Sequence, residues 1–147
     1  MWFSRKQVAK SSNDQAVMPI DQVTTKSLGD AAETLALNYL VKAGLKLVET
    51  NYRTPGRGGG EIDLIMRAQD GTLVFVEVRQ RSGHSFGGAG ASIGTVKQGR
   101  IINAARHYLM RFTRLPPCRF DVVLIQGGAG GMNNLKLEWL QAAFDAS

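Results

Sequence analysis

Two carboxylates stand out because each lies in a stretch that is otherwise apolar. Asp63 lies within residues 62–66 and Glu77 within residues 73–79. Successive side chains of a strand point to opposite faces, so Glu77 and Arg79 are expected on the same face. An unpaired buried charge costs several kcal/mol, so a glutamate in such a run needs a partner or a function. The structural explanation is an ion pair between Glu77 and Arg79, and the functional one is a cation-binding site.

Whether the two carboxylates meet depends on the hairpin loop between them. A two-residue loop pairs Leu64 with Glu77 and separates the carboxylates, whereas a three-residue loop at residues 69–71 pairs Asp63 with Glu77. We favour the longer loop, a type I turn followed by a glycine in the left-handed region. Carboxylates that close repel each other unless a cation lies between them, and Mg²⁺ needs only one or two of them. The backbone carbonyl of Val78 is a candidate third ligand.

The charge of the chain indicates a polyanionic partner. The 147 residues carry a net charge of +6, with a pI of about 9.8. No carboxylate lies between Glu77 and Asp121, while that segment holds eight basic residues: Arg79, Arg81, Lys97, Arg100, Arg106, Arg111, Arg114 and Arg119. A basic surface that serves only solubility is the alternative. An acidic centre beside a basic segment favours a cation site flanked by phosphate-binding side chains.

Composition narrows the class of protein. Apolar residues make up 44% and charged residues 20%, which is typical of a soluble globular domain. No apolar run reaches the roughly 18 residues that a membrane span requires. The one cysteine excludes an intramolecular disulfide and a cysteine-rich zinc site. Since residues 1–26 also lack a continuous apolar segment typical of a secretory signal, a cytoplasmic location is the default expectation.

The elements that must position these residues follow from hydrophobic periodicity and from glycine and proline signals. Residues 1–26 are expected to form a mobile tail and residues 27–147 one domain. Helices are predicted at 28–43 and 95–112, and strands at 45–53, 62–66, 73–79, 120–125 and 135–140. The apolar face of the first helix is predicted to hold Leu28, Ala32, Leu35, Tyr39 and Ala43. This order predicts an α/β fold with a mixed sheet and flanking helices.

Several of these segments together resemble a known family. They are Gly60-Glu61-Ile62-Asp63-Leu64-Ile65, Phe75-Val76-Glu77-Val78-Arg79-Gln80-Arg81, Lys97, and Arg119-Phe120-Asp121-Val122-Val123. Over residues 28–144 the chain resembles the YraN family of small bacterial proteins. That family is similar to archaeal Holliday-junction resolvases, so the resemblance implies a restriction-endonuclease-like α-β-β-β-α-β core. It also implies a PD-(D/E)xK nuclease site and a metal-dependent endonuclease acting on DNA, including branched DNA.

The resemblance assigns a role to each matching residue. Asp63 matches the first acid of the motif, Glu77 the second and Arg79 the lysine. Glu33 matches the acid that the first helix contributes. Arginine stays protonated and therefore does not serve as a general base, which favours the alternative of a nucleic-acid-binding protein without catalytic activity. For Asp121 we expect a structural pairing with an arginine rather than a catalytic role.

The remaining assignments concern partners. Candidates for contacts to the nucleic-acid backbone are Arg53, Arg57, Arg81, Lys97, Arg100, Arg106 and Arg111. Because junction-cutting relatives act as dimers, a homodimer is one arrangement that the resemblance allows. A serine hydrolase is a weaker alternative: residues 83–87 match G-x-S-x-G, but no histidine follows the candidate acids as a triad in that order requires.

Overall fold

The computed structural model describes residues 25–56, 59–82, 93–128 and 131–146. Its elements are α1 (Thr25–Lys42), β1 (Lys46–Arg53), β2 (Glu61–Arg67), β3 (Leu73–Ser82), α3 (Thr95–Leu109), β4 (Cys118–Gly128) and β5 (Gly131–Phe144). The predicted element order is therefore confirmed. Most of the predicted tail, Arg57 and the G-x-S-x-G segment lie outside the described residues, and Thr25 and Lys26 begin α1.

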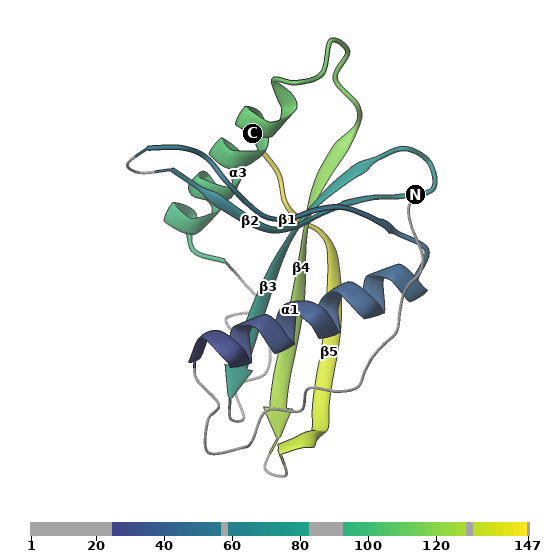
Figure 1. Ribbon diagram of the computed structural model, residues 1–147, viewed down its shortest axis with the longest axis vertical. Helices are drawn as coiled ribbons and strands as arrows, with labels where there is room; N and C mark the ends of the chain where they lie inside the picture. Colours follow the sequence, from purple (N-terminus) through teal and green to yellow (C-terminus); the bar gives the residue numbers. More distant parts are fainter. Residues whose placement is uncertain (1–24, 57–58, 83–92, 129–130, 147) are drawn as a thin grey trace.

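The sheet is mixed, with strand order β1-β2-β3-β4-β5. The only parallel pair that the described residues form is β3 with β4; the other three pairs are antiparallel. Helix α3 makes the crossover between the two parallel strands, and α1 crosses the other face of the sheet (Figure 1). This α/β arrangement is compatible with a restriction-endonuclease-like core, as predicted.

Alternate residues of β3 build two separate cores. Val74 and Val76 are fully buried against α1, whereas Leu73 and Phe75 are fully buried against α3. Figure 1 shows these helices on either side of the strand. The alternation confirms the predicted faces of this strand and places Glu77 on the α3 face.

The buried face of α1 differs from the prediction. The helix buries Ala32, Ala36 and Leu40, while Leu35 and Tyr39 are exposed. Ala43 is also exposed, and the Leu28 side chain lies outside the described residues. Two small alanines on the buried face let the helix lie close to β3 and β4, which a face built on leucine and tyrosine does not allow. Tyr39 packs its ring edge-on against Trp139 of β5, with ring centroids 6.3 Å apart.

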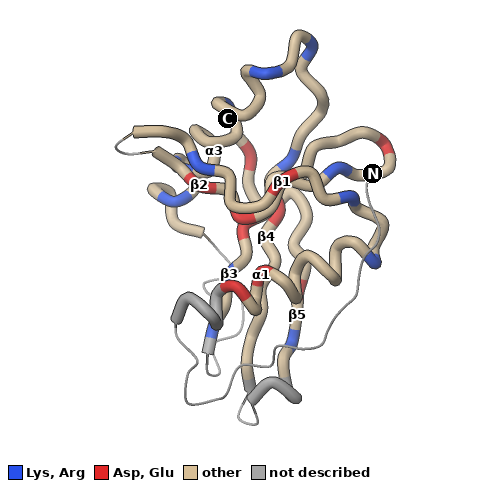
Figure 2. Tube along the Cα trace, viewed as in Figure 1, with Lys and Arg blue, Asp and Glu red and all other residues tan. Residues whose placement is uncertain are grey.

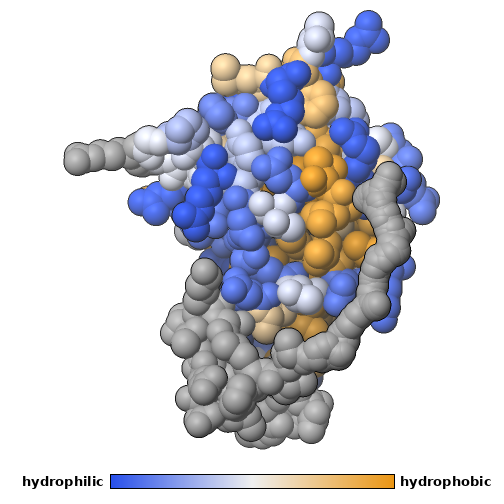
Figure 3. Space-filling view, viewed as in Figure 1, coloured by the Kyte–Doolittle hydropathy of each residue, from blue (hydrophilic) through white to orange (hydrophobic). Residues whose placement is uncertain are grey.

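Five large apolar side chains stay exposed on α1 and β1: Leu35, Tyr39, Val41, Leu47 and Val48. Figure 3 shows an apolar area on the face in view. In the part of the chain that the structure describes, no helix is long and apolar enough to cross a membrane.

The hairpin loop between β2 and β3 has three residues, as predicted. Leu64 pairs with Val76, and the ladder continues to the pair of Arg67 with Leu73. Gly71 adopts a positive φ of 93° and donates its N–H to the carbonyl of Ala68 at 3.0 Å. This is the left-handed glycine that the loop requires. The same register, continued by one residue, sets Asp63 opposite Glu77.

The C-terminal hairpin is longer than predicted. Strand β5 spans Gly131–Phe144 rather than residues 135–140, and the register shifts between Phe120 and Val122 of β4. An alternating pattern is interrupted at a bulge, so periodicity alone ends the predicted fifth strand too early.

Helix α3 also differs from the prediction, because it ends at Leu109 rather than at residue 112.

Candidate active site

Asp63 and Glu77 meet in a gap between β2 and β3. The paired ladder of these strands ends at Leu64 and Val76. Beyond it, the backbone N–H of Val78 donates to Asp63 Oδ2 at 2.8 Å, so a carboxylate takes the place of a strand carbonyl. The Asp63 and Glu77 side chains are hydrogen-bonded to each other. The structure thus confirms that these two carboxyl groups are neighbours.

A change of face in β2 turns Asp63 towards this gap. Ile62 is buried in the α3 core, whereas Leu64, two residues later, is buried in the α1 core. A regular strand keeps such residues on one face, so the strand turns over between them. Across the ladder, Asn51 of β1 lies opposite Asp63 and has a positive φ of 52°. Asparagine tolerates this left-handed conformation better than most residues do.

Glu77 is almost completely buried and its charge is compensated by α3. Its side chain is 8% exposed, and the Nζ of Lys97 lies 3.4 Å from its Oε2. Burial, and then the charge of Asp63, raises the pKa of Glu77 from 4.5 to about 8. Burial also raises the pKa of Asp63, although the hydrogen bond from Val78 opposes this effect. The pair therefore attracts a proton or a cation.

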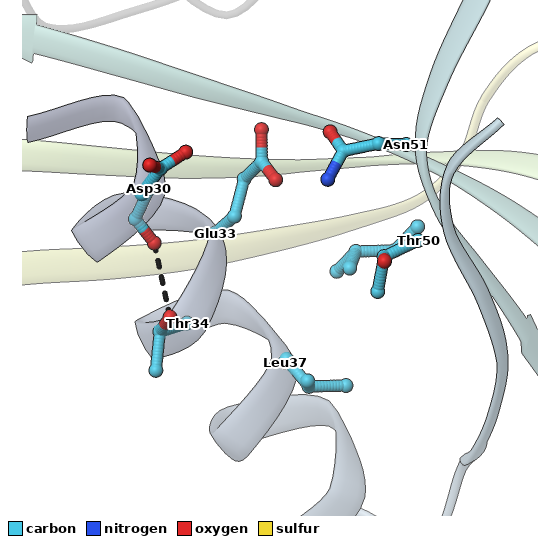
Figure 4. A pocket seen from close by; sticks show the side chains of 7 residues that line it. Asp30, Glu33, Thr34, Leu37, Thr50 and Asn51 are labelled. Atoms are coloured by element: carbon cyan, nitrogen blue, oxygen red, sulfur yellow. Dashed lines mark hydrogen bonds between the residues drawn. The ribbon is translucent and has the colours of Figure 1, made fainter. Parts of the chain in front are cut away.

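Glu33 approaches the same site from α1. It lines a cavity of about 250 Å³ between α1 and β1, with Asp30, Thr34, Leu37, Thr50, Asn51 and Leu64. Figure 4 shows the Glu33 carboxylate and the Asn51 amide pointing towards each other, and this amide opposes the rise in the pKa of Glu33. Burial, and then the negative charge of Asp63, raises the pKa of Glu33 to about 7.

The donor set suits a hard cation held by two carboxylates. Across the described ranges, no three His, Cys, Asp or Glu side chains group closely enough to hold a metal ion. Magnesium is commonly bound by one or two carboxylates and keeps several waters, which the Asp63–Glu77 pair satisfies. The Val78 carbonyl points to the same side of β3 as its N–H, because both belong to one residue of an extended strand. The two carboxylates and the strand carbonyl are therefore oxygen ligands of the kind that Mg²⁺ takes.

The predicted basic residues fall into two groups: those on α3, and those that form ion pairs with glutamates elsewhere. Lys97 lies in the site, and Arg100 and Arg106 are exposed on α3. Arg53 is paired with Glu61 at 3.3 Å and Arg111 with Glu49 at 3.9 Å. Figure 2 shows acidic positions near the centre of the view, with basic positions on α3 and around them.

Arg79 and Arg81, in the second half of β3, are half-buried. The Arg81 Nε is buried and finds no hydrogen-bond partner among the described residues. Both lie on the α3 face with Glu77 by strand alternation.

Two contacts of the site were not predicted from the sequence. The sequence offered an ion pair with Arg79 as the structural alternative for Glu77, and it did not indicate the ion pair with Lys97 that the structure contains. Lys97 is twenty residues downstream on another element, so spacing alone carries no signal of this contact. Asn51, which faces Glu33 across the cavity, was likewise not assigned a role, although an asparagine inside a strand is itself unusual.

Asp121 has the structural role that we predicted. It is fully buried and accepts hydrogen bonds from Arg119 Nε at 3.0 Å and from Trp139 Nε1 at 2.9 Å. It also accepts one from the backbone N–H of Ala142 at 2.9 Å, a residue with a positive φ of 50°. These bonds fasten β5 to β4 at the bulge.

Fold and site together define an α/β protein with an apposed pair of carboxyl groups in the middle of a mixed sheet. Residues 32–125 match the family described as "Uncharacterised protein family UPF0102", and the chain belongs to this family.

Its curated relatives cover most or all of its length. It is 68% identical over 149 residues to a UPF0102 protein of Polaromonas sp. (strain JS666), with 100% of both chains covered. Identity to the UPF0102 protein of Polaromonas naphthalenivorans is 67% over 153 residues, again with 100% of both chains covered. A relative from Cupriavidus taiwanensis is 58% identical over 118 residues, covering 80% of this chain and 82% of the relative. These names describe a family and not a reaction.

Proposed function

We propose that this protein is a metal-dependent endonuclease that hydrolyses phosphodiester bonds in DNA, including branched or otherwise structured DNA. The observation that carries the proposal is the hydrogen-bonded pair of Asp63 and Glu77 in a gap between two strands, beside the ammonium group of Lys97. Two buried carboxyl groups in contact are unfavourable without a positive charge between them, so the fold retains a costly arrangement here. Costly arrangements of this kind concentrate at functional sites.

Asp63 and Glu77 would hold Mg²⁺, with the Val78 carbonyl as a further oxygen ligand. Bound there, Mg²⁺ would polarise a phosphoryl oxygen and lower the pKa of a water molecule. The N–H of Val78 fixes Asp63 by holding one of its oxygens. Glu33, with a pKa of about 7, is suited to exchange a proton with water at its carboxyl group near neutral pH.

Arg79 and Lys97 would stabilise negative charge on the phosphate. Arginine remains protonated, so Arg79 acts as a fixed charge and a hydrogen-bond donor and not as a base. The exposed cations Arg100 and Arg106 continue the positive surface along α3. Contacts of this type position a nucleic acid without reading its sequence. Arg53 and Arg111 are weaker candidates because each is already paired with a glutamate.

A nucleic-acid-binding protein without catalytic activity is the second candidate. Arg79 favours it, because the resemblance places a lysine at this position in active enzymes. The two candidates share the basic surface and differ only in what the carboxylate pair does. Tight binding of DNA without cleavage at any Mg²⁺ concentration would select this second function.

A Mg²⁺ titration of cleavage on branched, duplex and single-stranded DNA tests the proposal. Asp63→Asn and Glu77→Gln replace each carboxylate with an amide of the same shape and serve as matched controls. We expect Mg²⁺-dependent cleavage by the native protein and a loss of at least two orders of magnitude in each variant. Cleavage that survives both substitutions would show that the site is wrong. Sedimentation of the same samples would test whether the protein forms the homodimer that the resemblance allows.

A further inference from the structure

Lys97 compensates the negative charge of the carboxylate pair. Its Nζ contacts Glu77 Oε2 at 3.4 Å, and its charge also lowers the pKa of Asp63. The two partners are buried to different degrees, since the Lys97 side chain is 50% exposed and the Glu77 side chain 8%. The carboxylate is therefore fixed, whereas the ammonium group has room to move towards solvent.

Backbone contacts fix the position of the helix that carries Lys97. A Cβ added to Gly60 would lie 1.8 Å from the carbonyl oxygen of Arg100, so α3 rests directly on the backbone that precedes β2. Gly60 is held in turn by Thr54, whose Oγ1 accepts its N–H at 2.7 Å. The side chain of Gln98 donates to the carbonyl of Ile93 at 2.8 Å and braces the start of the helix. Lys97 lies one turn before Arg100, so its backbone is held in place beside Glu77.

We propose that Lys97 is the resident counter-ion of the Asp63–Glu77 pair, and that it couples the binding of a divalent cation to the binding of a nucleic-acid phosphate. The inference rests on the proposed function because it takes the pair to be the metal site. It adds the order of events: the site holds metal weakly until a phosphate arrives.

The reason is the balance of charge at the site. A divalent cation held by Asp63 and Glu77 meets the Lys97 ammonium as a like charge next to a buried oxygen, where repulsion is strong. A bound phosphate draws the half-exposed Lys97 ammonium away from Glu77, which relieves its repulsion of the metal. Metal and nucleic acid then each strengthen the binding of the other, and by linkage the factor is the same in both directions. Removal of the Lys97 charge should remove much of this coupling.

Protons compete with a metal ion for the Glu77 carboxylate. The positive charge of Lys97 weakens the binding of both. A divalent ion carries twice the charge of a proton, so the loss of Lys97 favours the metal more than the proton.

Calorimetric titration with Ca²⁺, which takes the same oxygen ligands, measures the affinity directly and without reference to catalysis. The proteins are the native chain, Lys97→Met and Lys97→Arg, each titrated alone and with a short DNA duplex. Lys46→Met is the control for loss of a surface charge, because Lys46 lies at the opposite end of β1 from the site. Thermal unfolding of each variant establishes that it is folded.

We expect Lys97→Met to bind Ca²⁺ about ten-fold more tightly than the native protein in the absence of DNA, or about 1.4 kcal/mol. Lys97→Arg and Lys46→Met should match the native protein. DNA should raise the Ca²⁺ affinity of the native protein about ten-fold and that of Lys97→Met clearly less. Equal or weaker Ca²⁺ binding by Lys97→Met would overturn the inference and leave the metal site intact. If neither protein binds Ca²⁺, the metal site itself is wrong and the inference falls with it.

Discussion

The metal-free protein should lose stability as the pH rises, and Glu77→Gln should suppress this loss. Glu77 has a pKa of about 8 in the folded protein and 4.5 as its ordinary value, so the folded state binds its proton more tightly. Its contribution to the free energy of unfolding is therefore complete below about pH 4.5 and is lost as the pH rises through about 8. Asp63 and Glu33 act in the same direction because their pKa values are also raised.

The size of the effect follows from this difference in pKa. Since the Glu77 side chain is only 8% exposed, the shift corresponds to on the order of 3–5 kcal/mol. Glutamine has the shape of a protonated glutamate, and its amide N–H is able to donate to Asp63 in the same way. The variant should thus resemble the protonated native protein at every pH. At about 2–4 °C per kcal/mol for a domain of this size, its melting temperature should exceed that of the native protein by about 10 °C above pH 8.

The assay is thermal and urea unfolding from about pH 5 to pH 9 in the presence of a chelator. We expect the two proteins to have similar stability at the acidic end and to diverge as the pH increases. Mg²⁺ should restore the native protein at high pH and not the variant, because binding to the folded state alone stabilises it. A difference between the two proteins that does not change with pH would refute the reasoning.

Three further predictions concern the fold and the basic surface. Asp121→Ala should lower the free energy of unfolding, measured in urea, by about 3–5 kcal/mol, because it leaves Arg119 and Trp139 without their buried acceptor. The Ca²⁺ affinity of this variant should equal that of the native protein, since Asp121 has a structural role. Gly60→Ala should cost about 1–3 kcal/mol, because its Cβ meets the Arg100 carbonyl; a melting temperature equal to that of the native protein would contradict this. Arg100→Ala should weaken DNA binding equally for all sequences and reduce the slope of log affinity against log salt by about 1, as measured by fluorescence anisotropy.

The sequence was sufficient to predict the apposition of Asp63 and Glu77. The prediction needed only two local rules, the alternation of side chains in a strand and the loop geometry that a glycine at position 71 favours. Both rules act over a few residues and can therefore be applied to the sequence alone. The buried role of Asp121 was accessible for a similar reason, since a lone acid in an apolar strand near an arginine needs a partner.

The sequence was insufficient wherever distant elements meet. The ion pair of Glu77 with Lys97 depends on how α3 docks against Gly60, and local pattern does not report docking. The buried face of α1 was only partly predicted, because more than one set of apolar residues in this helix has helical spacing. Ala32 is buried as predicted, but the fit of the helix to the sheet selects Ala36 and Leu40 beside it rather than Leu35 and Tyr39.

The most direct test of the account is the response of backbone amide signals to Mn²⁺ in nuclear magnetic resonance spectra. Mn²⁺ prefers the same oxygen ligands as Mg²⁺ and broadens the signals of nearby nuclei. At substoichiometric Mn²⁺ we predict that the amide of Val78, which donates to Asp63, broadens first together with those of Asp63 and Glu77. The amide of Leu73, at the far end of β3, should stay sharp, and Asp63→Asn should abolish the effect. Uniform broadening, or broadening centred elsewhere in the chain, would contradict a metal site at this carboxylate pair.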